Sequence, residues 1–271
     1  MPELPEVETS RLGILPHIEG KCFKQVVIRQ SQLRWPVPNA LTTLLPGLQL
    51  QSVTRRGKYL LFATSAGSVL LHLGMSGNLR ITRSDQIAGK HDHVDFIFSD
   101  DTLLRFNDQR KFGAVLWTSE AVENHPLLLK LGPEPLSDAF TADYLQGKAA
   151  NRRVAVKAWL MDSHIVVGVG NIYANESLFL AGIHPARSAA TLSQIECVHL
   201  VEAVKSVLQQ AIQQGGTTLR DFTNAQGKPG YFQQSLNVYA RDGEACKLCG
   251  QTLQLLKIGQ RSSFFCSNCQ K

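Results

Sequence analysis

The sequence predicts an α+β protein with a strand-rich amino-terminal part, a helical central part and a small cysteine-bearing end. Three observations predict this class. Short apolar or alternating segments recur through residues 21–118, apolar residues follow a helical spacing through 195–212, and four of the six cysteines lie in the last 26 residues. A chain of 271 residues is long enough for about two domains, each with its own core.

Composition and charge narrow the class of protein. Hydrophobic residues make up 44% of the chain and charged residues 18%, which excludes a disordered protein. The net charge of +6 favours a polyanionic partner, although well-solvated basic proteins are common. The acidic start MPELPEVE is the opposite of a secretory signal, and no apolar run is long enough to span a bilayer. We therefore expect a cytosolic protein that does not enter a membrane.

The first residues offer an unusual nucleophile. Removal of Met1, which a small second residue permits, would leave Pro2 as a free secondary amine beside Glu3. A terminal amine has a pKa of about 8, against roughly 10.4 for lysine, so it supplies an uncharged nucleophile without deep burial. The neighbouring carboxylate could take or give the proton. This pair could therefore be a catalytic device.

A short helix is expected next, from Val7 to Leu15, stopped by Pro16. The apolar pattern then changes to that of strands separated by Gly, Asp, Asn or Ser. The expected strands are Lys24–Ile28, Leu48–Thr54, Tyr59–Thr64, Ser68–Leu73, Asn78–Thr82, Val94–Phe98, Thr102–Phe106 and Ala114–Trp117. Such spacing indicates a mostly antiparallel sandwich or barrel.

Proline and glycine interrupt any regular element in HPLLLKLGPEPLSDAF, so the linker between domains is placed there. Beyond it, Ile195, Val198 and later apolar residues form a helical core stripe, which Gly215 and Gly216 close. The expected division is an amino-terminal domain at 1–130, a linker at 131–150, a helical domain at 151–236 and a cysteine-bearing module at 237–271.

The carboxy-terminal cysteines form two Cys-x-x-Cys knuckles, CKLC and CSNC, separated by sixteen residues. Knuckles at this separation can present four thiolates tetrahedrally to one zinc ion, with a β-hairpin between them. Two disulfides or a redox pair are the alternatives, and neither fits a basic chain without an export signal. Four thiolates leave no open position, so one structural Zn²⁺ is expected. Its ligands would be Cys246, Cys249, Cys266 and Cys269.

The stretch VVGVGNIYANESLFLAG predicts a tight turn at Gly168 and Gly170 and then a helix to about Leu180, with Asn171 as its N-cap. The upstream stretch VAVKAWLMD would form a partner helix, as in a helix-turn-helix. Free N–H groups at such a helix start bind phosphate, and Asn171 could add a donor. An ordinary glycine turn with an asparagine cap is the commoner alternative.

Basic residues cluster at RRGKY, where Arg55, Arg56 and Lys58 stand at an expected strand start. Most such lysines are solvated, but one in a polyanion-binding cleft could serve as a general acid or base. Arg261, at the expected hairpin tip IGQR, is either a solvated charge or a bidentate partner of a phosphate.

Large side chains also fall among glycines on expected loops. Met75 lies in LGMSG, and Arg110 and Phe112 lie in NDQRKFG. These side chains could be tucked into the core. Proteins that kink DNA or flip a base insert apolar wedges between bases, and these residues suit that role as well.

Together these stretches resemble the formamidopyrimidine-DNA glycosylases, base-excision enzymes that remove oxidised purines. The resemblance extends over essentially the whole chain. It rests on PELPEVE, RRGKYLL, HLGMSG, KHDHVDF, RKFG, LGPEPL, VGVGNIYANESLFLAGIHP, QGGTTLRDF, GKPGYF, VYARDG and the four-cysteine hairpin. The combination of PELPEVE at the start with four cysteines at the end is highly specific.

The resemblance implies a β-sandwich domain, a helix-two-turn-helix domain and a zinc finger, acting as a monomer on damaged double-stranded DNA. It implies that Pro2 attacks the sugar C1′ and forms a Schiff base, that Glu3 is the acid/base, and that Lys58 assists β-elimination. Arg261 would hold a phosphate and serve δ-elimination. Removal of 8-oxoguanine or a formamidopyrimidine would thus be followed by nicking of the abasic site, in the bacterial cytoplasm and at the nucleoid.

The resemblance also implies a set of DNA contacts. Asn171 would hold a phosphate together with Arg261. Met75, Arg110 and Phe112 would fill the gap left by the flipped base. His91, Arg110 and Arg152 match further DNA-contact positions, and lesion choice would depend on a loop within 217–232.

Two departures from the family pattern concern local geometry rather than the reaction. Gln109 stands where a proline is frequent, and Asn175 stands where an aspartate is usual. The close alternative is an endonuclease VIII-type enzyme, which prefers oxidised pyrimidines, but ELPEVE and RKFG favour the purine-directed branch. A non-enzymatic DNA-binding protein is a further alternative, and the presence of Pro2 and Glu3 opposes it.

Overall fold

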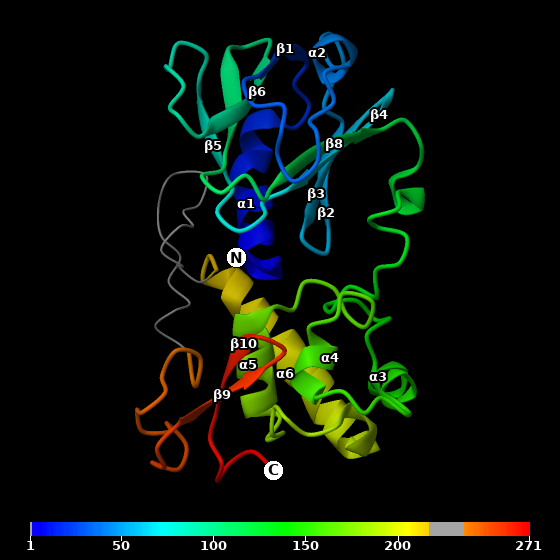
Figure 1. Ribbon diagram of the computed structural model, residues 1–271. Coiled ribbons are helices and arrows are strands. Elements are labelled where there is room, and N and C mark those ends of the chain that lie inside the picture. Colours follow the sequence, from blue (N-terminus) through cyan, green and yellow to red (C-terminus); the bar gives the residue numbers. More distant parts are fainter. Residues whose placement is uncertain (1, 217–235) are drawn as a thin grey trace. The chain divides into compact units, whose positions relative to one another are not determined.

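The structure is a computed structural model that describes residues 2–216 and 236–271. The chain divides into two compact units, each described separately below. The first contains Met1–Leu129 with Gln214–Tyr231, and the second contains Lys130–Gln213 with Phe232–Lys271 (Figure 1). The loop within 217–232 that is expected to govern lesion choice lies outside the described residues.

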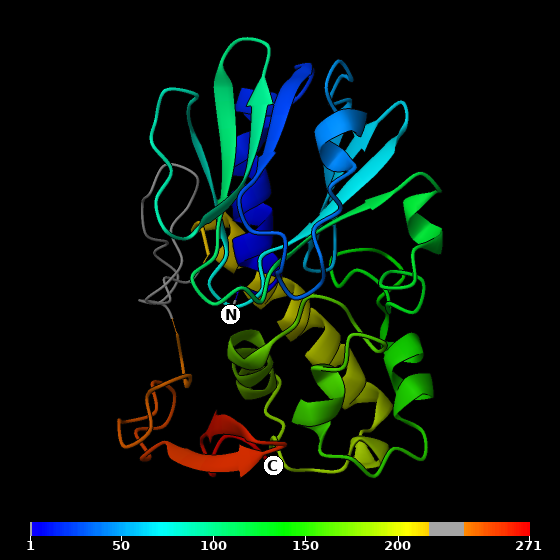
Figure 2. The same cartoon turned by 45° about the horizontal axis from the view of Figure 1, so that its top comes forward.

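The first unit is a sandwich of two antiparallel four-stranded sheets, with strand orders β1-β6-β7-β5 and β2-β3-β4-β8 (Figure 2). The strands are β1 (Phe23–Ile28), β2 (Ser52–Arg56), β3 (Tyr59–Thr64), β4 (Gly67–His72), β5 (Asn78–Arg83), β6 (Asp92–Phe98), β7 (Thr102–Asn107) and β8 (Ala114–Thr118). Each expected strand is present, and the sandwich rather than the barrel is confirmed. The second strand begins later than expected because the backbone at Leu48 and Leu50 bonds to Phe23 and Lys21 instead.

Aromatic side chains fill the space between the two sheets. Phe62 of one sheet meets Phe96 of the other edge to face, with ring centroids 6.1 Å apart. Phe23 stacks on Phe98 with centroids 4.9 Å apart, and all four rings are buried. Close-packed aromatic rings of this kind bury a large apolar area and resist deformation. The turns at the ends of the strands are therefore carried by a rigid core.

Helix α1 (Leu4–Ile18) packs against strands of both sheets. The expectation that Pro16 ends this helix is wrong, because α1 continues through Pro16 for two further residues. A proline this close to the end of a helix removes only one backbone hydrogen bond. Ile14 and Ile18 are fully buried on either side of it, so the last turn is held by the core.

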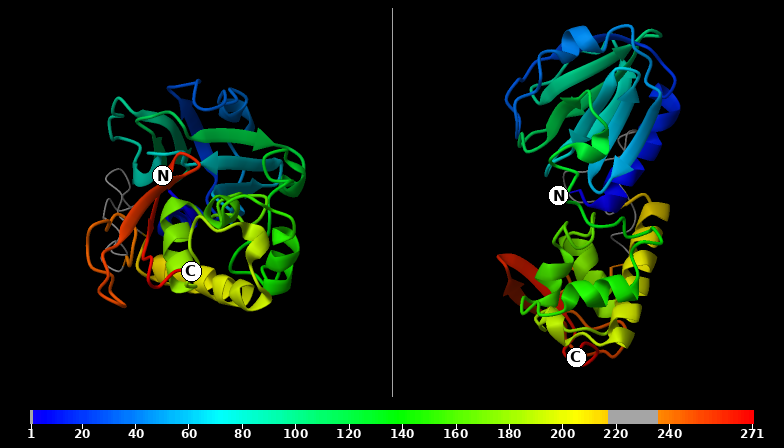
Figure 3. Two further views of the ribbon diagram at one scale, coloured as in Figure 1. Left: turned by 60° about the horizontal axis from the view of Figure 1, so that its bottom comes forward. Right: turned by 90° about the vertical axis from the view of Figure 1, so that its right-hand side faces the viewer.

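The second unit is built around α5 (Asn171–Leu180) and α6 (Gln194–Gln213), which pack against each other (Figure 3). The expected partner helix is present as α4 (Val156–Leu160) and contacts α5. The stretch expected as a linker, 131–150, contains α3 (Ala142–Ala149), which packs on α6. Leu145 and Ala149 of α3 are buried, so this stretch belongs to the helical unit. Among the described residues, no helix is both long and apolar enough to cross a bilayer.

Three further short elements are α2 (Leu41–Leu44), η1 (Val122–Asn124) and η2 (Ala189–Thr191). The core stripe of α6 differs from expectation at its start, where Ile195 is 60% exposed. The buried face begins at Cys197 and continues through Leu200 and Val204. Ile195 lies in the first turn, on the side of α6 away from this face.

The carboxy-terminal hairpin consists of β9 (Gln254–Ile258) and β10 (Arg261–Phe265), which pair antiparallel between the two cysteine pairs. Strand β10 packs against α5. Phe264 and Leu253 share a buried cluster with Phe179 of α5. The hairpin therefore rests on the helical unit through apolar contacts in addition to its cysteines.

Candidate active site and zinc centre

The amino terminus of α1 places the candidate acid/base Glu3 at a helix start. Glu3 is the N-cap, in extended conformation, and forms a capping box with Glu6. The Glu3 N–H donates to Glu6 Oε2 at 2.8 Å. Capping boxes satisfy backbone N–H groups that a helix start leaves without partners. The same pairing gives the buried Glu3 carboxylate one defined direction beside Pro2, which is also buried.

The basic stretch RRGKY forms a hairpin turn rather than a strand start. Arg56 ends β2 and pairs with Tyr59 of β3, so Gly57 and Lys58 form the two-residue turn between them. Gly57 has φ +57°, a left-handed conformation that glycine adopts without strain. Lys58 is therefore presented at the tip of a short, rigid hairpin.

Arg55 is committed to an ion pair within the sandwich unit. Its Nε donates to Glu8 Oε2 at 2.9 Å, and Arg11 binds the same carboxylate at 2.7 Å. Burial raises the pKa of Glu8, but the hydrogen bonds and charges of Arg11 and Arg55 outweigh it and lower the pKa overall. Of the basic residues in RRGKY, Arg55 thus supports the fold.

His72, which the sequence reasoning missed, is half-buried at the end of β4, the strand next to the Lys58 turn. His72 pairs with Tyr59 across β4 and β3, and the centroids of their two rings lie 4.8 Å apart. Its Nδ1 accepts the N–H of Gly74 at 2.9 Å. Burial, with the positive charges of Lys58 and Arg34, lowers the pKa of His72 to about 4. The neutral imidazole is thus a fixed neighbour of Lys58, and its place as the first residue of HLGMSG was the signal that could have drawn attention to it.

The three candidate wedge residues lie on two neighbouring loops of the sandwich unit. Phe112 is 44% exposed, and the Arg110 guanidinium lies over its ring at 5.1 Å from the centroid. Met75 is half-buried on the loop after β4. A Cβ on Gly74 would lie 2.4 Å from the backbone of Gly113, so the two loops approach more closely than any side chain would permit. The structure therefore brings the two wedge loops together.

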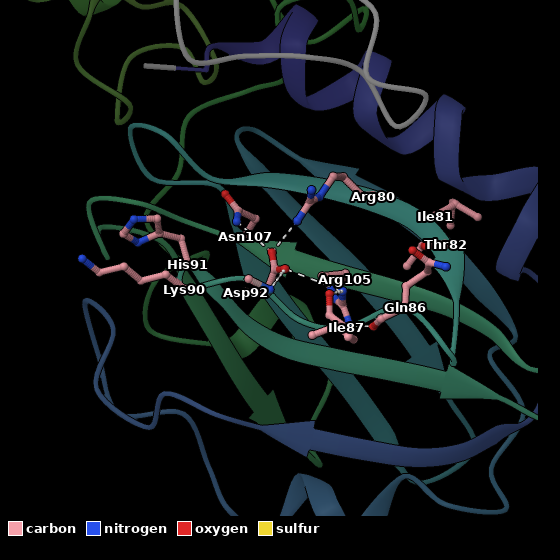
Figure 4. A pocket seen from close by; sticks show the side chains of 11 residues that line it. Arg80, Ile81, Thr82, Gln86, Ile87, Lys90, His91, Asp92, Arg105 and Asn107 are labelled. Carbon is pink, nitrogen blue, oxygen red and sulfur yellow. Dashed lines mark hydrogen bonds and ion pairs between the residues drawn. The ribbon is translucent and has the colours of Figure 1, made fainter.

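His91 lies at the edge of a pocket of about 630 Å³ on the β5–β7–β6 sheet (Figure 4). Figure 4 shows His91 and Lys90 together at one end, apart from a cluster of Arg80, Asp92 and Arg105. Arg80 and Arg105 both form ion pairs with the buried Asp92. Burial raises the pKa of Asp92, but its hydrogen bonds and the Arg80 charge lower it overall. The two arginines are thus largely neutralised, and His91 and Lys90 form the more available end.

Asn171 occupies the first turn of α5, but not as the expected N-cap. Gly170 is the N-cap, and the helix begins at Asn171. Gly168, with φ +83°, makes the preceding turn. The Asn171 Oδ1 is buried and has no hydrogen-bond partner among the described residues. Because an amide oxygen only accepts hydrogen bonds, a phosphate at this helix start would be bound by the Asn171 NH₂ group or by backbone N–H groups.

Arg261 stands at the start of β10, opposite Ile258. The turn residues Gly259 and Gln260 both have positive φ, +53° and +65°, as a tight two-residue hairpin requires. The Arg261 side chain is exposed, and no ion pair to it occurs in the described parts of the chain. Its guanidinium is therefore free to take an external anion.

Buried polar side chains fasten the start of α5 to β10. Asn175 donates through Nδ2 to the Asn171 carbonyl at 2.6 Å and accepts the Phe264 N–H at 2.8 Å. Lys157 of α4 donates to the Ser262 carbonyl at 2.6 Å. Both side chains are 1% exposed. The two candidate phosphate ligands, Asn171 and Arg261, are thus connected through elements held by direct hydrogen bonds.

Glu176, the next residue of α5, holds the chain leading into the hairpin. Its two carboxylate oxygens accept the backbone N–H groups of Asn237, Val238 and Tyr239 at 2.8 to 2.9 Å. Arg152, in contrast, is exposed and lies with Lys148 and Trp159 in a separate pocket of about 240 Å³. Nothing among the described contacts connects Arg152 to Asn171 or Arg261.

The four carboxy-terminal cysteines form the metal centre. Their Sγ atoms all lie within 4.8 Å of one another, with Cys246 and Cys269 at 3.9 Å and Cys249 and Cys266 at 3.5 Å. Zn–S bonds of about 2.3 Å in a tetrahedron place sulfurs about 3.8 Å apart, so the four thiols fit one zinc ion. All four cysteines are free thiols, and the expected structural zinc is confirmed.

These features place the protein in the class of proteins that combine a β-sandwich unit with a helical unit and a four-cysteine zinc hairpin. Family models match it in three stretches: the formamidopyrimidine-DNA glycosylase N-terminal domain at residues 1–115, the H2TH domain of the same enzymes at 131–223, and the zinc finger found in FPG and IleRS at 243–271. The chain belongs to the formamidopyrimidine-DNA glycosylase family.

Individual relatives agree over the full length. The formamidopyrimidine-DNA glycosylases of Saccharophagus degradans and Klebsiella pneumoniae are each 55% identical over 271 residues, covering all of both chains. The crystal structure of the MutM (Fpg) protein of Thermus thermophilus has a TM-score of 0.89 at 37% identity, covering 99% of this chain and 98% of that one. A complex of Lactococcus lactis Fpg with DNA containing an abasic site has a TM-score of 0.91 at 33% identity, covering 99% of each chain.

We predict that zinc holds the hairpin. Cys246→Ser or Cys269→Ser should lose the bound metal and melt the hairpin, because so small a module depends on metal for its folding energy. Cys22→Ser and Cys197→Ser are the matched controls and should retain one zinc per chain by elemental analysis. A Cys269→Ser protein that keeps its zinc would contradict this assignment.

The low pKa of His72 predicts a pH-dependent stability. The His72 imidazole takes up a proton near pH 6.5 in the unfolded chain, but only near pH 4 in the folded chain. The free energy of unfolding is therefore lost as pH falls from 6.5 to 4. The loss at pH 5 should be about 2 kcal/mol. Urea unfolding at pH 7.5, 6 and 5 should show this loss in the wild type and not in His72→Gln. Equal losses in the two proteins would contradict it.

The Asn175 contacts predict the effect of restoring the residue usual in the family. Asn175→Asp replaces the Nδ2 donor with a carboxylate oxygen that faces the carbonyl oxygen of Asn171. This repulsion and the lost hydrogen bond should lower the free energy of unfolding by about 1–3 kcal/mol at pH 8. Protonation supplies the missing donor, so the deficit should shrink toward pH 5. Asn39→Asp, an exposed position, is the matched control for the added charge. An unchanged unfolding midpoint in Asn175→Asp at pH 8 would contradict the prediction.

Proposed function

We propose that this protein is a bifunctional DNA glycosylase that removes oxidised purines from duplex DNA and nicks the resulting abasic site. Relatives 55% identical over the full length are formamidopyrimidine-DNA glycosylases. Similar structures are complexes of Lactococcus lactis Fpg with DNA containing N7-benzyl-Fapy-dG or an abasic site. The observation that carries the proposal is the opening PELPEVE, with Glu3 buried at the start of α1 directly beside Pro2.

The reaction begins at the amine of Pro2 after removal of Met1. The nitrogen attacks C1′ of the damaged nucleotide, the bond from C1′ to the base breaks, and the base leaves with a proton. Glu3 exchanges protons at the deoxyribose as the sugar ring opens and the Schiff base forms. Loss of the C2′ proton then breaks the bond to the 3′ oxygen, and δ-elimination breaks the bond to the 5′ oxygen. The amine is regenerated by hydrolysis of the imine.

The remaining residues position the DNA. Lys58, on its rigid turn beside neutral His72, assists β-elimination. Arg261 holds a phosphate near the lesion and serves δ-elimination, with Asn171 at the same phosphate. Met75, Arg110 and Phe112 fill the gap left by the flipped nucleotide. His91 and Arg152 are further contacts to DNA, and Arg152 has the least structural support of these.

Several expectations remain predictions. They are the monomeric state, action in the cytoplasm and at the nucleoid, and the domain boundaries 1–130, 151–236 and 237–271, while α3 places the expected linker 131–150 with the helical unit. The bacterial relatives and the DNA substrate support the location. The purine preference rests on the family, and a duplex carrying an oxidised thymine tests the pyrimidine alternative directly.

The decisive experiment traps the Schiff base. Borohydride added during reaction on a duplex with 8-oxoguanine opposite C should yield a covalent protein–DNA adduct that peptide mapping places on Pro2. An amino-terminal extension that blocks the amine should abolish both trapping and base release. An adduct mapped to Lys58 would overturn the mechanism.

Glu3→Gln should keep DNA binding and lose most base release, because it preserves shape and removes the proton-transfer group. Glu19→Gln, at the exposed far end of the same helix, is the matched control and should excise 8-oxoguanine at the wild-type rate. Single-turnover excision assays measure both. Equal rates for the two variants would reject the role of Glu3.

A further inference from the structure

Asp108 connects the two wedge loops through its side chain. Its carboxylate accepts the Ser76 hydroxyl at 2.7 Å, the Arg110 N–H at 3.2 Å and the Gly113 N–H at 2.7 Å. Ser76 follows Met75, and Gly113 follows Phe112. The Ser76 hydroxyl also accepts the Arg110 N–H, at 3.1 Å. A single carboxylate therefore bonds to Arg110 itself and to the immediate neighbours of the other two wedge residues.

The backbone of Asp108 is held equally firmly. Its N–H donates to the His91 carbonyl at 3.0 Å, and its own carbonyl accepts from the buried His93 Nε2 at 2.7 Å. Asp108 follows directly after β7, so its position is continuous with the rigid sandwich core. The loop that carries His91, a further proposed DNA contact, is thus tied to the same residue.

Burying the Asp108 carboxylate costs free energy. Asp108 is 0% exposed, and in the described part of the chain no cation forms an ion pair with it. A buried charge is expensive unless it is paired or fully hydrogen-bonded. Three donors from two loops offset the cost here. The residue is therefore better explained by the geometry that it imposes on the loops than by stability.

We propose that Asp108 is a positioning residue that holds Met75, Arg110 and Phe112 in the arrangement needed to fill the gap left by a flipped nucleotide, with Ser76 as the bridge between the loops. This inference rests on the proposed function, because it gives the three side chains a task only on duplex DNA. A wedge that is already in place loses no side-chain or loop entropy on insertion. Asp108 thereby acts on base flipping and not on the chemistry at C1′.

Asp108→Asn tests this with almost no change of shape. The amide has one acceptor oxygen, so its NH₂ group must face at least one of the donors that the carboxylate accepts. Single-turnover excision of 8-oxoguanine opposite C should slow by about tenfold or more. The rate of base flipping, measured by the fluorescence of a 2-aminopurine placed beside the lesion, should fall by a similar factor. Nicking of a preformed abasic site should change less than about threefold, since no paired base is displaced.

Controls separate this proposal from the proposed function and from misfolding. Asp100→Asn makes the same chemical change at a side chain that is 49% exposed, and should excise at the wild-type rate. Ser76→Ala removes only the bridging hydroxyl and should give a smaller loss of the same kind, which keeps the test valid if Asp108→Asn does not fold. Thermal unfolding and zinc content verify the fold of each variant.

Three outcomes would overturn the inference. If Met75→Ala and Phe112→Ala slow excision from duplex DNA but Asp108→Asn and Ser76→Ala do not, the wedge role stands and the positioning role of Asp108 is wrong. If Asp108→Asn lowers excision and abasic-site nicking equally, the residue supports the fold in general. If Met75→Ala and Phe112→Ala themselves behave as wild type, the wedge role in the proposed function fails, and the inference fails with it.

Discussion

Buried backbone N–H groups need acceptors, and this requirement shapes several of the segments that carry proposed functional residues. Four side chains that are at most 1% exposed supply these acceptors: Glu6, Asp108, Asn175 and Glu176. Glu6 binds the N–H of Glu3, and Asp108 binds those of Arg110 and Gly113. Asn175 and Glu176 do the same for β10 and for the chain that enters the zinc hairpin. Removing one of these acceptors would leave N–H groups buried without partners, and the segment would rearrange.

The same structure separates cations that support the fold from those available to DNA. Arg55 and Arg105 are held in ion pairs with buried or half-buried carboxylates, and Arg80 shares Asp92 with Arg105. The exposed Arg261 forms no such pair within the described residues, and Arg110 lies on an exposed aromatic ring. The net charge of +6 therefore does not show which positive charges are available to DNA and which are neutralised within the fold. Arg261 and Arg110 are among the residues that the resemblance assigns to a phosphate and to the opened base stack.

Rigid turns suit the chemistry proposed for this protein. Flipping a nucleotide out of a duplex costs a few kcal/mol, and side chains that already stand in position offset part of it without losing entropy of their own. The close backbone approach of Gly74 to Gly113 and the two-residue turn at Gly57 both restrict movement at these sites. The zinc centre and the hydrogen bonds of Asn175 restrict the movement of β10 in the same way. Separate sets of contacts thus preorganise the catalytic groups and the wedge groups.

Most elements of the fold could be predicted from local sequence, because strand alternation, helical period and cysteine spacing are properties of neighbouring residues. The eight strands, α5, α6 and the zinc ligands followed from these patterns. Helix α3 and the passage of α1 through Pro16 did not, since burial of Leu145 and Ile18 against other elements outweighs local signals. The same applies to Ile195, whose exposure depends on which face of α6 its neighbours cover.

The candidate site divides in the same way. The sequence by itself indicated the residues that are proposed to carry the chemistry, Pro2, Glu3, Lys58 and Arg261, and the four cysteines of the metal centre, because reactivity and metal binding depend on residue type and motif. Only the tertiary structure decided what holds them. His72 beside Lys58, Asp108 between the wedge loops and Asn175 between α5 and β10 are set by contacts between residues as many as 89 positions apart in the chain. Such contacts leave no periodic trace in the sequence, because they depend on how sheets and helices pack rather than on the order of neighbouring residues.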